Sequence, residues 1–184
     1  MANNQYLGTY HMVNTGTNFE PMRRNNFELQ ITGLDESIGS GAANTIMLSV
    51  ASFTAPQISL NRIDIRYGNN VTKFAGVPDF QDCSLVCNDF IGKNVEVLLQ
   101  KWFALAYNPE TQKVGLAQDY RKEAKLIEYD PAGNFVRQWT LVNCWLQSLQ
   151  LGDFSQDGGT EARKVTCTFV YDAAVPGDFK ITNT

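Results

Sequence analysis

Hydrophobic and polar side chains alternate one for one in several short runs of this chain. Between residues 27 and 32 every second side chain is hydrophobic, which is the period of a β-strand with one buried face. The same alternation recurs at residues 45–50, 62–67, 80–88 and 165–171. These runs predict five strands, and the third carries only charged side chains, Arg62, Asp64 and Arg66, on its polar face.

Two more β-prone runs, at residues 120–129 and 135–145, flank the sequence Asp-Pro-Ala-Gly-Asn at 130–134. Proline presets the backbone angle of a tight turn, and glycine accepts the left-handed conformation that such turns need. The two runs therefore predict a β-hairpin, which brings the number of expected strands to seven.

The hydrophobic period changes in one segment only, where it becomes helical. Asn88 or Asp89 can cap the start of this helix, because a short side-chain oxygen accepts bonds from the first free backbone N–H groups. Asn108 and Pro109 are expected to end it, since the residue before a proline avoids helical angles. The apolar positions with helical spacing are Val95, Leu98, Leu99, Trp102 and Ala106.

Glycine, proline and small polar residues separate these elements. Loops are expected at residues 35–44, 76–78, 109–118 and 152–159, and a turn at 68–70. The predicted fold is mainly β (α+β), a two-sheet antiparallel β-sandwich or barrel with one flanking α-helix. The expected organisation is an N-terminal arm at 1–26, a β domain at 27–174 and a C-terminal tail at 175–184.

Length and charge limit the possible functions. The 184 residues, 43% of them hydrophobic, suit a single domain with a real core. A net charge of −4 argues against tight, nonspecific binding to nucleic acid, which needs a basic surface. Neither a signal peptide nor a bilayer-spanning run is recognisable, so synthesis in the cytosol without membrane association is expected.

The four cysteines do not form a recognisable disulfide or zinc pattern. Cys83 and Cys87 fall in one predicted strand, which places their Cα atoms about 13 Å apart, beyond disulfide reach. No pair has the Cys-x-x-Cys spacing of a metal site, and the one histidine, His11, lies in the polar leader. Cys144 and Cys167 complete the set, and all four are expected to be buried thiols without a bound metal.

The sequence also matches no motif for catalysis or cofactor binding. The glycine-rich residues 39–44 lie between two predicted strands and open no predicted helix, which a phosphate-binding loop requires. His11, the one histidine, lies in a polar leader, and nothing in the surrounding sequence would hold it against the core as a nucleophile–base pair requires. Acidic pairs such as Asp79 and Asp82 have no apolar surroundings that would separate their pKa values. The expectation is a protein that is not an enzyme and has no cofactor.

The order of these signals resembles the tail tube proteins of contractile-tailed phages and related injection systems. The resemblance runs from about Asn26 to Asp172 and rests on joint order and spacing rather than on a chemical motif. Its parts are Asn-Phe-Glu-Leu-Gln-Ile at 26–31, Ser-Phe-Thr-Ala-Pro at 52–56, Phe-Ala-Gly at 74–76, Cys-Asn-Asp at 87–89, Lys-Trp at 101–102, Tyr-Arg-Lys-Glu-Ala at 120–124 and Val-Thr-Cys-Thr-Phe-Val-Tyr-Asp at 165–172.

The resemblance implies a structural subunit that forms hexameric rings, stacked into a phage tail tube for genome delivery. It also implies strands that join neighbouring subunits into one barrel, which would remove the open strand edges of an isolated sandwich. The implied partners are further copies of the chain, the sheath, tape measure and baseplate proteins, and double-stranded DNA that passes without tight binding. The implied location is the virion tail, assembled in the cytoplasm of a bacterial host.

In such a ring, the second, third, fifth and sixth predicted strands are expected to line the channel, with apolar faces toward the subunit core. The arm, the 35–44 loop and the loop after the helix are candidates for contacts between rings and with a sheath. The lumen-facing candidates are Ser49, Arg62, Asp64, Arg66, Arg121, Glu123, Lys125, Gln138 and Thr140.

Two other functions remain open at this stage. The first is an inner tube or secreted ring protein of a bacterial contractile injection system, which would share this pattern. The second is a small-ligand-binding β-sandwich module, which would be a monomer with exposed aromatic side chains in a cleft.

Overall fold

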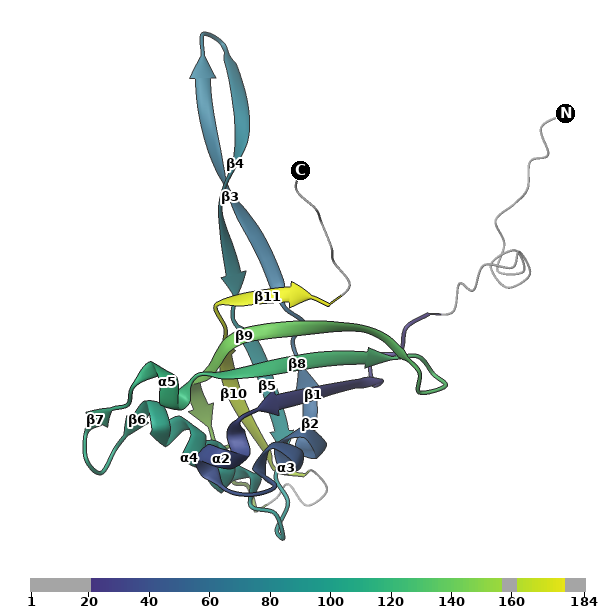
Figure 1. Ribbon diagram of the computed structural model, residues 1–184, viewed down its shortest axis with the longest axis vertical. Helices are drawn as coiled ribbons and strands as arrows, with labels where there is room; N and C mark the ends of the chain where they lie inside the picture. Colours follow the sequence, from purple (N-terminus) through teal and green to yellow (C-terminus); the bar gives the residue numbers. More distant parts are fainter. Residues whose placement is uncertain (1–20, 157–161, 178–184) are drawn as a thin grey trace, which may run out of the picture.

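One antiparallel sheet organises most of the protein. The computed structural model describes residues 21–156 and 162–177, and the main sheet has the strand order β1-β8-β9-β10-β5-β2, with β11 beside β9 (Figure 1). This architecture confirms the mainly β class and the flanking helix. Its strands are β1 (Phe27–Thr32), β2 (Val50–Phe53), β5 (Cys83–Asn88), β8 (Lys122–Tyr129), β9 (Phe135–Gln150), β10 (Lys164–Val170) and β11 (Ala173–Pro176).

Strand β9 joins the two halves of this sheet. Its 16 residues pair with β8 and β11 in their first part and with β10 in their second part. The long strand curves between these parts, so the two halves enclose a common interior in a sandwich-like arrangement (Figure 1). The described strands do not close into a barrel, because β1 and β2, at the two ends of the strand order, do not pair with each other.

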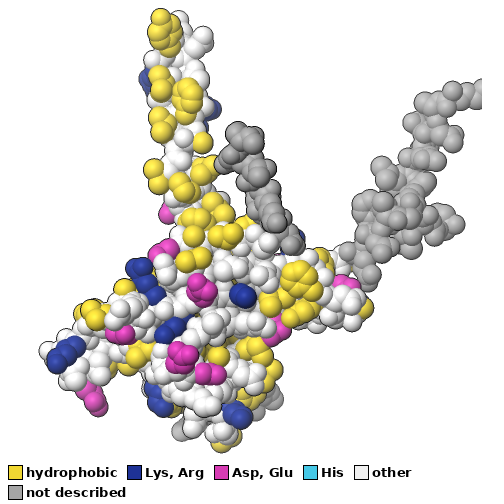
Figure 2. Space-filling model, viewed as in Figure 1, with side chains coloured by type: hydrophobic (Ala, Val, Ile, Leu, Met, Phe, Trp, Pro, Cys, Tyr) yellow, Lys and Arg dark blue, Asp and Glu magenta, His cyan; other side chains and the backbone are white. Residues whose placement is uncertain are grey.

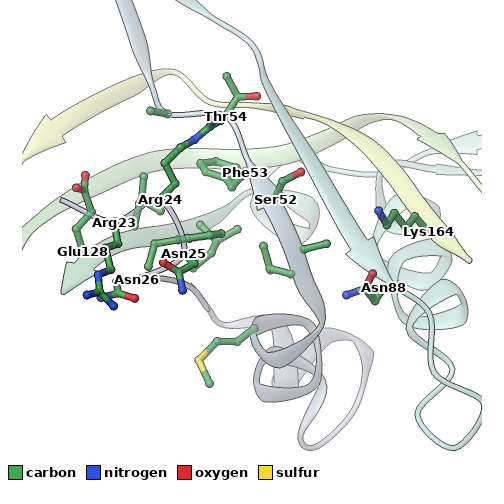
Figure 3. Close-up of a pocket in the computed structure, with 17 residues that line it drawn as sticks. Arg23, Arg24, Asn25, Asn26, Ser52, Phe53, Thr54, Asn88, Glu128 and Lys164 are labelled. Atoms are coloured by element: carbon green, nitrogen blue, oxygen red, sulfur yellow. The ribbon is translucent and has the colours of Figure 1, made fainter. Parts of the chain in front are cut away.

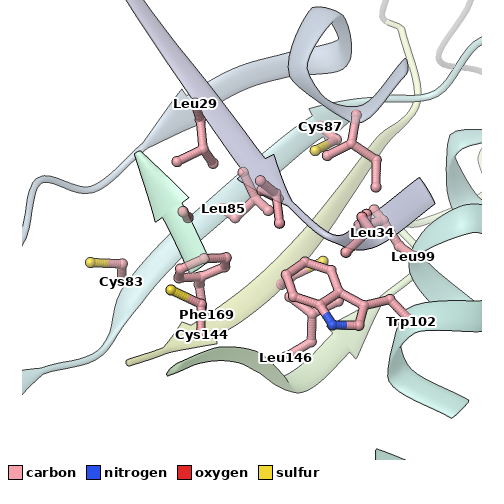
Figure 4. Packing of buried hydrophobic residues seen from close by; sticks show 14 of the residues in the cluster. Leu29, Leu34, Cys83, Leu85, Cys87, Leu99, Trp102, Cys144, Leu146 and Phe169 are labelled. Carbon is pink, nitrogen blue, oxygen red and sulfur yellow. The ribbon is translucent and has the colours of Figure 1, made fainter. Parts of the chain in front are cut away.

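The core lies between the two sheet halves and helix α4 (Val95–Ala106). Phe169 of β10 is fully buried, and its ring meets Phe53 and Trp102 edge-on, with centroid separations of 5.5 and 6.0 Å (Figure 4). Trp102 also donates its indole N–H to the carbonyl of Tyr120 at 3.0 Å. Because edge-to-face contacts are favourable for aromatic rings, these side chains fix the helix against the sheet.

The predicted helix is confirmed, and its start is stabilised by a residue named from the sequence. The N-cap is Asn94, whose φ of 45° places it in the left-handed region. The Asp89 carboxylate nevertheless accepts a hydrogen bond from the backbone N–H of Glu96 at 3.4 Å. The helix ends at Ala106, where Tyr107 takes an extended conformation just before Asn108 and Pro109.

The predictions for residues 35–50 are wrong. This region forms helices α2 (Leu34–Ile38) and α3 (Ala42–Ser49) rather than a loop followed by a strand. The buried residues of α3 are Ala42, Ile46 and Ser49, which are three and four positions apart and therefore share one helical face. Leu48, expected in the core with Ile46, is 72% exposed.

The loops expected at 76–78 and 109–118 also contain regular structure. Residues 76–78 belong to β4 (Asn70–Gln81), which pairs with β3 (Gln57–Tyr67) in a separate two-stranded sheet. Pro78 is tolerated there because a strand with a free edge does not need every backbone N–H. The region after α4 holds a short strand pair, β6 (Tyr107–Asn108) and β7 (Lys113–Val114), and the helix α5 (Ala117–Tyr120).

The hairpin around residues 130–134 is confirmed as β8 and β9. The Asp130 carboxylate closes the turn by accepting bonds from the backbone N–H of Asn134 at 2.7 Å and from its side-chain amide at 2.9 Å. Gly133 supplies the required left-handed angle, with φ at 87°. The final predicted strand is confirmed as β10, and β11 follows it as far as Pro176.

The four cysteines are free and buried, as predicted. Burial raises the pKa of Cys87 to about 11 and the pKa values of Cys144 and Cys167 to about 12, because a thiolate is poorly solvated in the core. Burial also raises the pKa of Cys83. In the native protein these groups are therefore small hydrophobic side chains rather than nucleophiles.

A thiol titration tests whether burial suppresses the reactivity of the four cysteines. At pH 8 the native chain is expected to react with a disulfide reagent at least about a hundredfold more slowly than the chain in denaturant, because a raised pKa leaves less thiolate. The thiols stay protonated in the folded state while those of the unfolded state ionise. Stability is therefore complete below the ordinary thiol pKa and falls as the pH rises from there toward about 12. Fast stoichiometric labelling of native protein would contradict this account.

Candidate assembly surfaces

The β3–β4 hairpin projects from the body of the protein (Figure 1). All eleven residues of β3 are exposed, and an extended strand of that length spans about 36 Å. Within the described chain the hairpin pairs only with itself, so both of its outer edges are open. Exposed strand edges are templates for pairing with another chain.

The hairpin is amphipathic, but its apolar face changes half-way along. In the half near the body, Ile58 pairs with Phe80 and Leu60 with Pro78 on one face. In the distal half, Ile63 pairs with Phe74 on the opposite face. The change coincides with an extra residue in β4, where the register shifts between Leu60 and Arg62.

A glycine makes this irregularity possible. A Cβ atom at Gly76 would lie 2.7 Å from the carbonyl oxygen of Asn61, which is closer than a side chain can approach a fixed backbone atom. The two strands cross in the view of Figure 1 near the middle of the hairpin, so the ribbon turns over there. Figure 2 shows hydrophobic side chains along both halves in a single view. The change of face and the turn of the ribbon thus give one apolar side over its whole length.

These apolar side chains are exposed to a degree that is unusual for a monomer. Tyr67 is 88% exposed, Val77 71% and Leu60 60%, and Ile63, Ile65 and Phe74 are each exposed by about half. Contiguous apolar surfaces of this kind mark sites that bind another protein. The prediction that the apolar face of the third strand packs on the subunit core is therefore wrong.

The opposite face of the distal hairpin is charged. Arg62 and Asp64 lie two residues apart on β3 and form an ion pair at 2.7 Å, and Lys73 lies across from Asp64 on β4. Arg66 continues the same face toward the tip. Residues 62–75 carry three basic side chains and one acidic one, a net charge of +2. An exposed pair of this kind contributes little to stability, so these charges remain available to a partner.

A second open region lies between the edges of the main sheet. A groove of about 1060 Å³ separates β1 from β2 and is lined by Leu29 and Phe53 together with Arg23, Arg24 and Lys164. Arg24 comes from the segment before β1 and Phe53 from β2 (Figure 3). The groove exposes backbone groups of two edge strands, which makes it a place where a further strand can bind.

The nine residues expected to line a channel do not share one surface: four lie on one face of β8 and β9, and Arg62, Asp64 and Arg66 lie on the hairpin. Glu123, Lys125 and Thr140 lie on the outward face of β8 and β9, where Lys125 pairs directly with Thr140, and the buried Ala124 and Leu141 lie on the other face. Gln138, two residues before Thr140, shares this outward face.

Two of the expected residues lie elsewhere. Ser49 is 1% exposed at the end of α3, where its hydroxyl donates to the carbonyl of Ile46 at 2.7 Å, so it faces the protomer core and not a channel. Arg121 lies between α5 and β8 and forms an ion pair with Asp172 at 3.1 Å. The prediction for Ser49 was wrong because the alternation at residues 45–50 was interpreted as a strand.

The glycine-rich residues 39–44 open a helix, so the expectation that they lie between two strands is wrong. Gly41, with φ at 79°, is the N-cap of α3. The Asp35 carboxylate accepts the backbone N–H of Ala43 at 2.7 Å and thus occupies the position where a phosphate would bind. Among residues 21–156 and 162–177, no three His, Cys, Asp or Glu side chains are grouped to hold a metal ion. No described helix is long and apolar enough to cross a membrane.

No protein-family model matches this chain, and no curated protein matches its sequence. Its fold is nevertheless similar to solved structures. The extracellular contractile injection system PVC, in its sheath–tube complex in the extended state, contains a chain of 17% identity and TM-score 0.66, over 93% of this chain and 98% of that one. The anti-feeding prophage cap, which terminates a tube, contains a chain of 18% identity and TM-score 0.65, over 85% and 91%. The chain therefore shares its fold with a chain of a sheath–tube complex and a chain of a tube-terminating cap.

Proposed function

We propose that this protein is the structural subunit of a tail tube, in which six copies form a ring and rings stack around a central channel. The observation that carries the proposal is the projecting hairpin, with its continuous apolar side and two unpaired edges. An isolated protomer leaves this surface in water, whereas assembly with identical copies covers it. The similarity in fold to chains of tube-containing particles supports the same conclusion.

In the proposed ring, each of these surfaces has a role. The free edges of the hairpin and of β1 pair between neighbouring copies, since each exposes unpaired N–H and C=O groups. The apolar side of the hairpin packs on the body of the neighbour. The outward face of β8 and β9, with Glu123, Lys125, Gln138 and Thr140, then lines the channel. Arg62, Asp64 and Arg66 line it where the hairpin continues the wall.

A channel of this composition suits the passage of a polyanion. The named wall residues comprise three basic and two acidic side chains, so they offer no uniform basic surface that would hold DNA by releasing its counterions. In a phage, the tube would deliver the genome, with a sheath outside, a tape measure protein inside during assembly and a baseplate at one end. Assembly would take place in the bacterial host, and the product would be part of the virion tail.

The inner tube of a bacterial contractile injection system is the second candidate. It is favoured by the titles of the similar structures, which name an extracellular contractile injection system and an anti-feeding prophage. Both candidates use the same rings and differ in the cargo.

Electron microscopy of the purified full-length chain tests the proposal. We expect rings or hollow tubes in negative stain, and masses of six protomers or multiples of six by mass photometry. A monomer that persists at high protein concentration would contradict the proposal. It would instead favour a binding module that uses the groove between β1 and β2.

A further inference from the structure

The groove between β1 and β2 is lined by side chains of two kinds. Phe27, Val50 and Phe53 are half-buried and pack against the core, so they give the groove an apolar lining. The lining also contains three basic side chains, and Arg23 and Arg24 are fully on the surface of the protomer. Lys164, the third, is exposed as well.

The groove does not neutralise its own positive charge. Among the residues that line it, Glu128 is the one acidic side chain, and its carboxylate already binds Arg137 at 2.7 Å. Three basic side chains and one acidic one leave a net charge of +2 on the lining. Within residues 21–156 and 162–177, none of the three basic side chains forms an ion pair. Their charges are therefore available to a partner.

The segment that carries the two arginines is held in place. The backbone N–H of Asn26 donates to the carbonyl of Arg23 at 3.4 Å, and the side-chain amide of Asn26 donates to the carbonyl of Asp130 at 3.0 Å. In Figure 3, Arg23 and Arg24 lie on one side of Phe53 and Lys164 on the other. Because this backbone is preorganised, a partner pays little entropy to order it.

The half of the hairpin near the body has the opposite charge. We call residues 57–61 and 76–82 the near half. Its exposed apolar side chains are Ile58, Leu60 and Val77, at 46%, 60% and 71%. It contains two acidic side chains, Asp79 and Asp82, and no basic one, so its net charge is −2. Both acidic side chains are exposed, and neither forms an ion pair within the described chain.

The near half cannot fill the groove of its own protomer. Thr54 and Ala55 line the groove, and β3 begins only two residues later, at Gln57, so the hairpin leaves the body from the groove itself. The ring of Phe80 meets Tyr171 edge-on, with a centroid separation of 6.0 Å, which holds the base of the hairpin against the protomer. A near half that enters the groove must therefore come from a second copy.

The other exposed apolar surfaces match the groove less well in charge. The distal half of the hairpin, residues 62–75, has a net charge of +2 and would be repelled. The described residues around Phe90, Ile91 and Phe154, at 89–94, 151–156 and 162–163, contain two acidic and two basic side chains. Residues 107–120, with the exposed Val114 and Leu116, have a net charge of −1. The near half is thus the most acidic of these surfaces.

We infer that the groove between β1 and β2 binds the near half of the hairpin of the next copy in the ring, an inference that rests on the proposed tube. The exposed apolar side chains of the near half pack on the apolar lining of the groove. Asp79 and Asp82 approach the basic side chains around it. The contact is heterologous, so each copy uses its groove toward one neighbour and its hairpin toward the other, as closure of a ring requires.

Charge reversal on either side of the contact tests the inference. The hairpin variant is Asp79→Lys with Asp82→Lys, and the groove variant is Arg24→Glu with Lys164→Glu. Each variant alone brings like charges together, so we expect the protein concentration needed for rings to rise at least about tenfold by mass photometry. An equimolar mixture of the two variants should form rings at the wild-type concentration, because each groove then meets a hairpin of opposite charge.

The matched control is Lys93→Glu with Lys101→Glu, two exposed lysines outside the groove. It changes the net charge as much as the groove variant does, yet it should form rings like the wild type and should not rescue the hairpin variant. Groove-variant rings at the wild-type concentration would overturn the inference and leave the proposed function intact. An impaired groove variant beside an unaffected hairpin variant would also overturn it, because another surface would then occupy the groove. A wild-type chain that forms neither rings nor tubes would overturn both.

Discussion

Replacing Phe169 by alanine is expected to destabilise the protomer by about 3–5 kcal/mol, the usual cost of removing a fully buried phenylalanine. Phe169 is 0% exposed and contacts Phe53 of β2 and Trp102 of α4. Its removal leaves a cavity where both halves of the sheet meet the helix. Because a domain of this size is stable by only about 5–15 kcal/mol, the loss is a large fraction of the total.

Urea denaturation, monitored by far-UV circular dichroism, measures this loss of unfolding free energy. The matched control is Phe135→Ala at the start of β9, where the ring is 54% exposed, and its stability should change by less than about 0.5 kcal/mol. Both variants need to be compared at a concentration at which the wild type is monomeric, because association adds to apparent stability. Equal midpoints for the two variants would show that Phe169 is not central to the core.

Strands with one face in the protomer core were predictable from the sequence. The alternation in β1 and β10 and the turn at Asp130 each have a local physical cause, which periodicity and turn chemistry capture. The segment around Ile46 was not predictable in this way. Over only six residues, periodicity does not distinguish a strand that buries Ile46 and Leu48 from a helix that buries Ile46 and Ser49, and the deciding contacts of α3 are tertiary.

The hairpin shows a different limit of sequence patterns. Alternation in β3 correctly separated Arg62, Asp64 and Arg66 from Ile63 and Ile65, but it does not say what covers the apolar side. A surface that packs on another copy has the same pattern as one that packs on its own core. Such surfaces are recognised only when the structure shows them exposed. On β4 the corresponding change of face depends on an extra residue between Ala75 and Pro78, which alternation alone does not reveal.

Placing glutamate at both Ile63 and Phe74 is expected to abolish assembly while the protomer remains folded. The two residues form a cross-strand pair on the apolar side of the hairpin, and each is 51% exposed. Charging them therefore costs the isolated protomer little. In a ring, the same charges would be buried against a neighbour without a partner, so we expect each contact to weaken at least about a hundredfold.

The opposite face of the same hairpin supplies the control. Arg62→Asn with Asp64→Asn removes an exposed ion pair without changing the net charge, so ring formation should be retained. Mass photometry distinguishes monomers from rings, and thermal unfolding confirms that each variant is folded. If the glutamate variant formed rings as well as the control did, the hairpin would not lie between subunits. The apolar side would then need another partner, because six large hydrophobic side chains exposed by about half or more are too costly to leave in water.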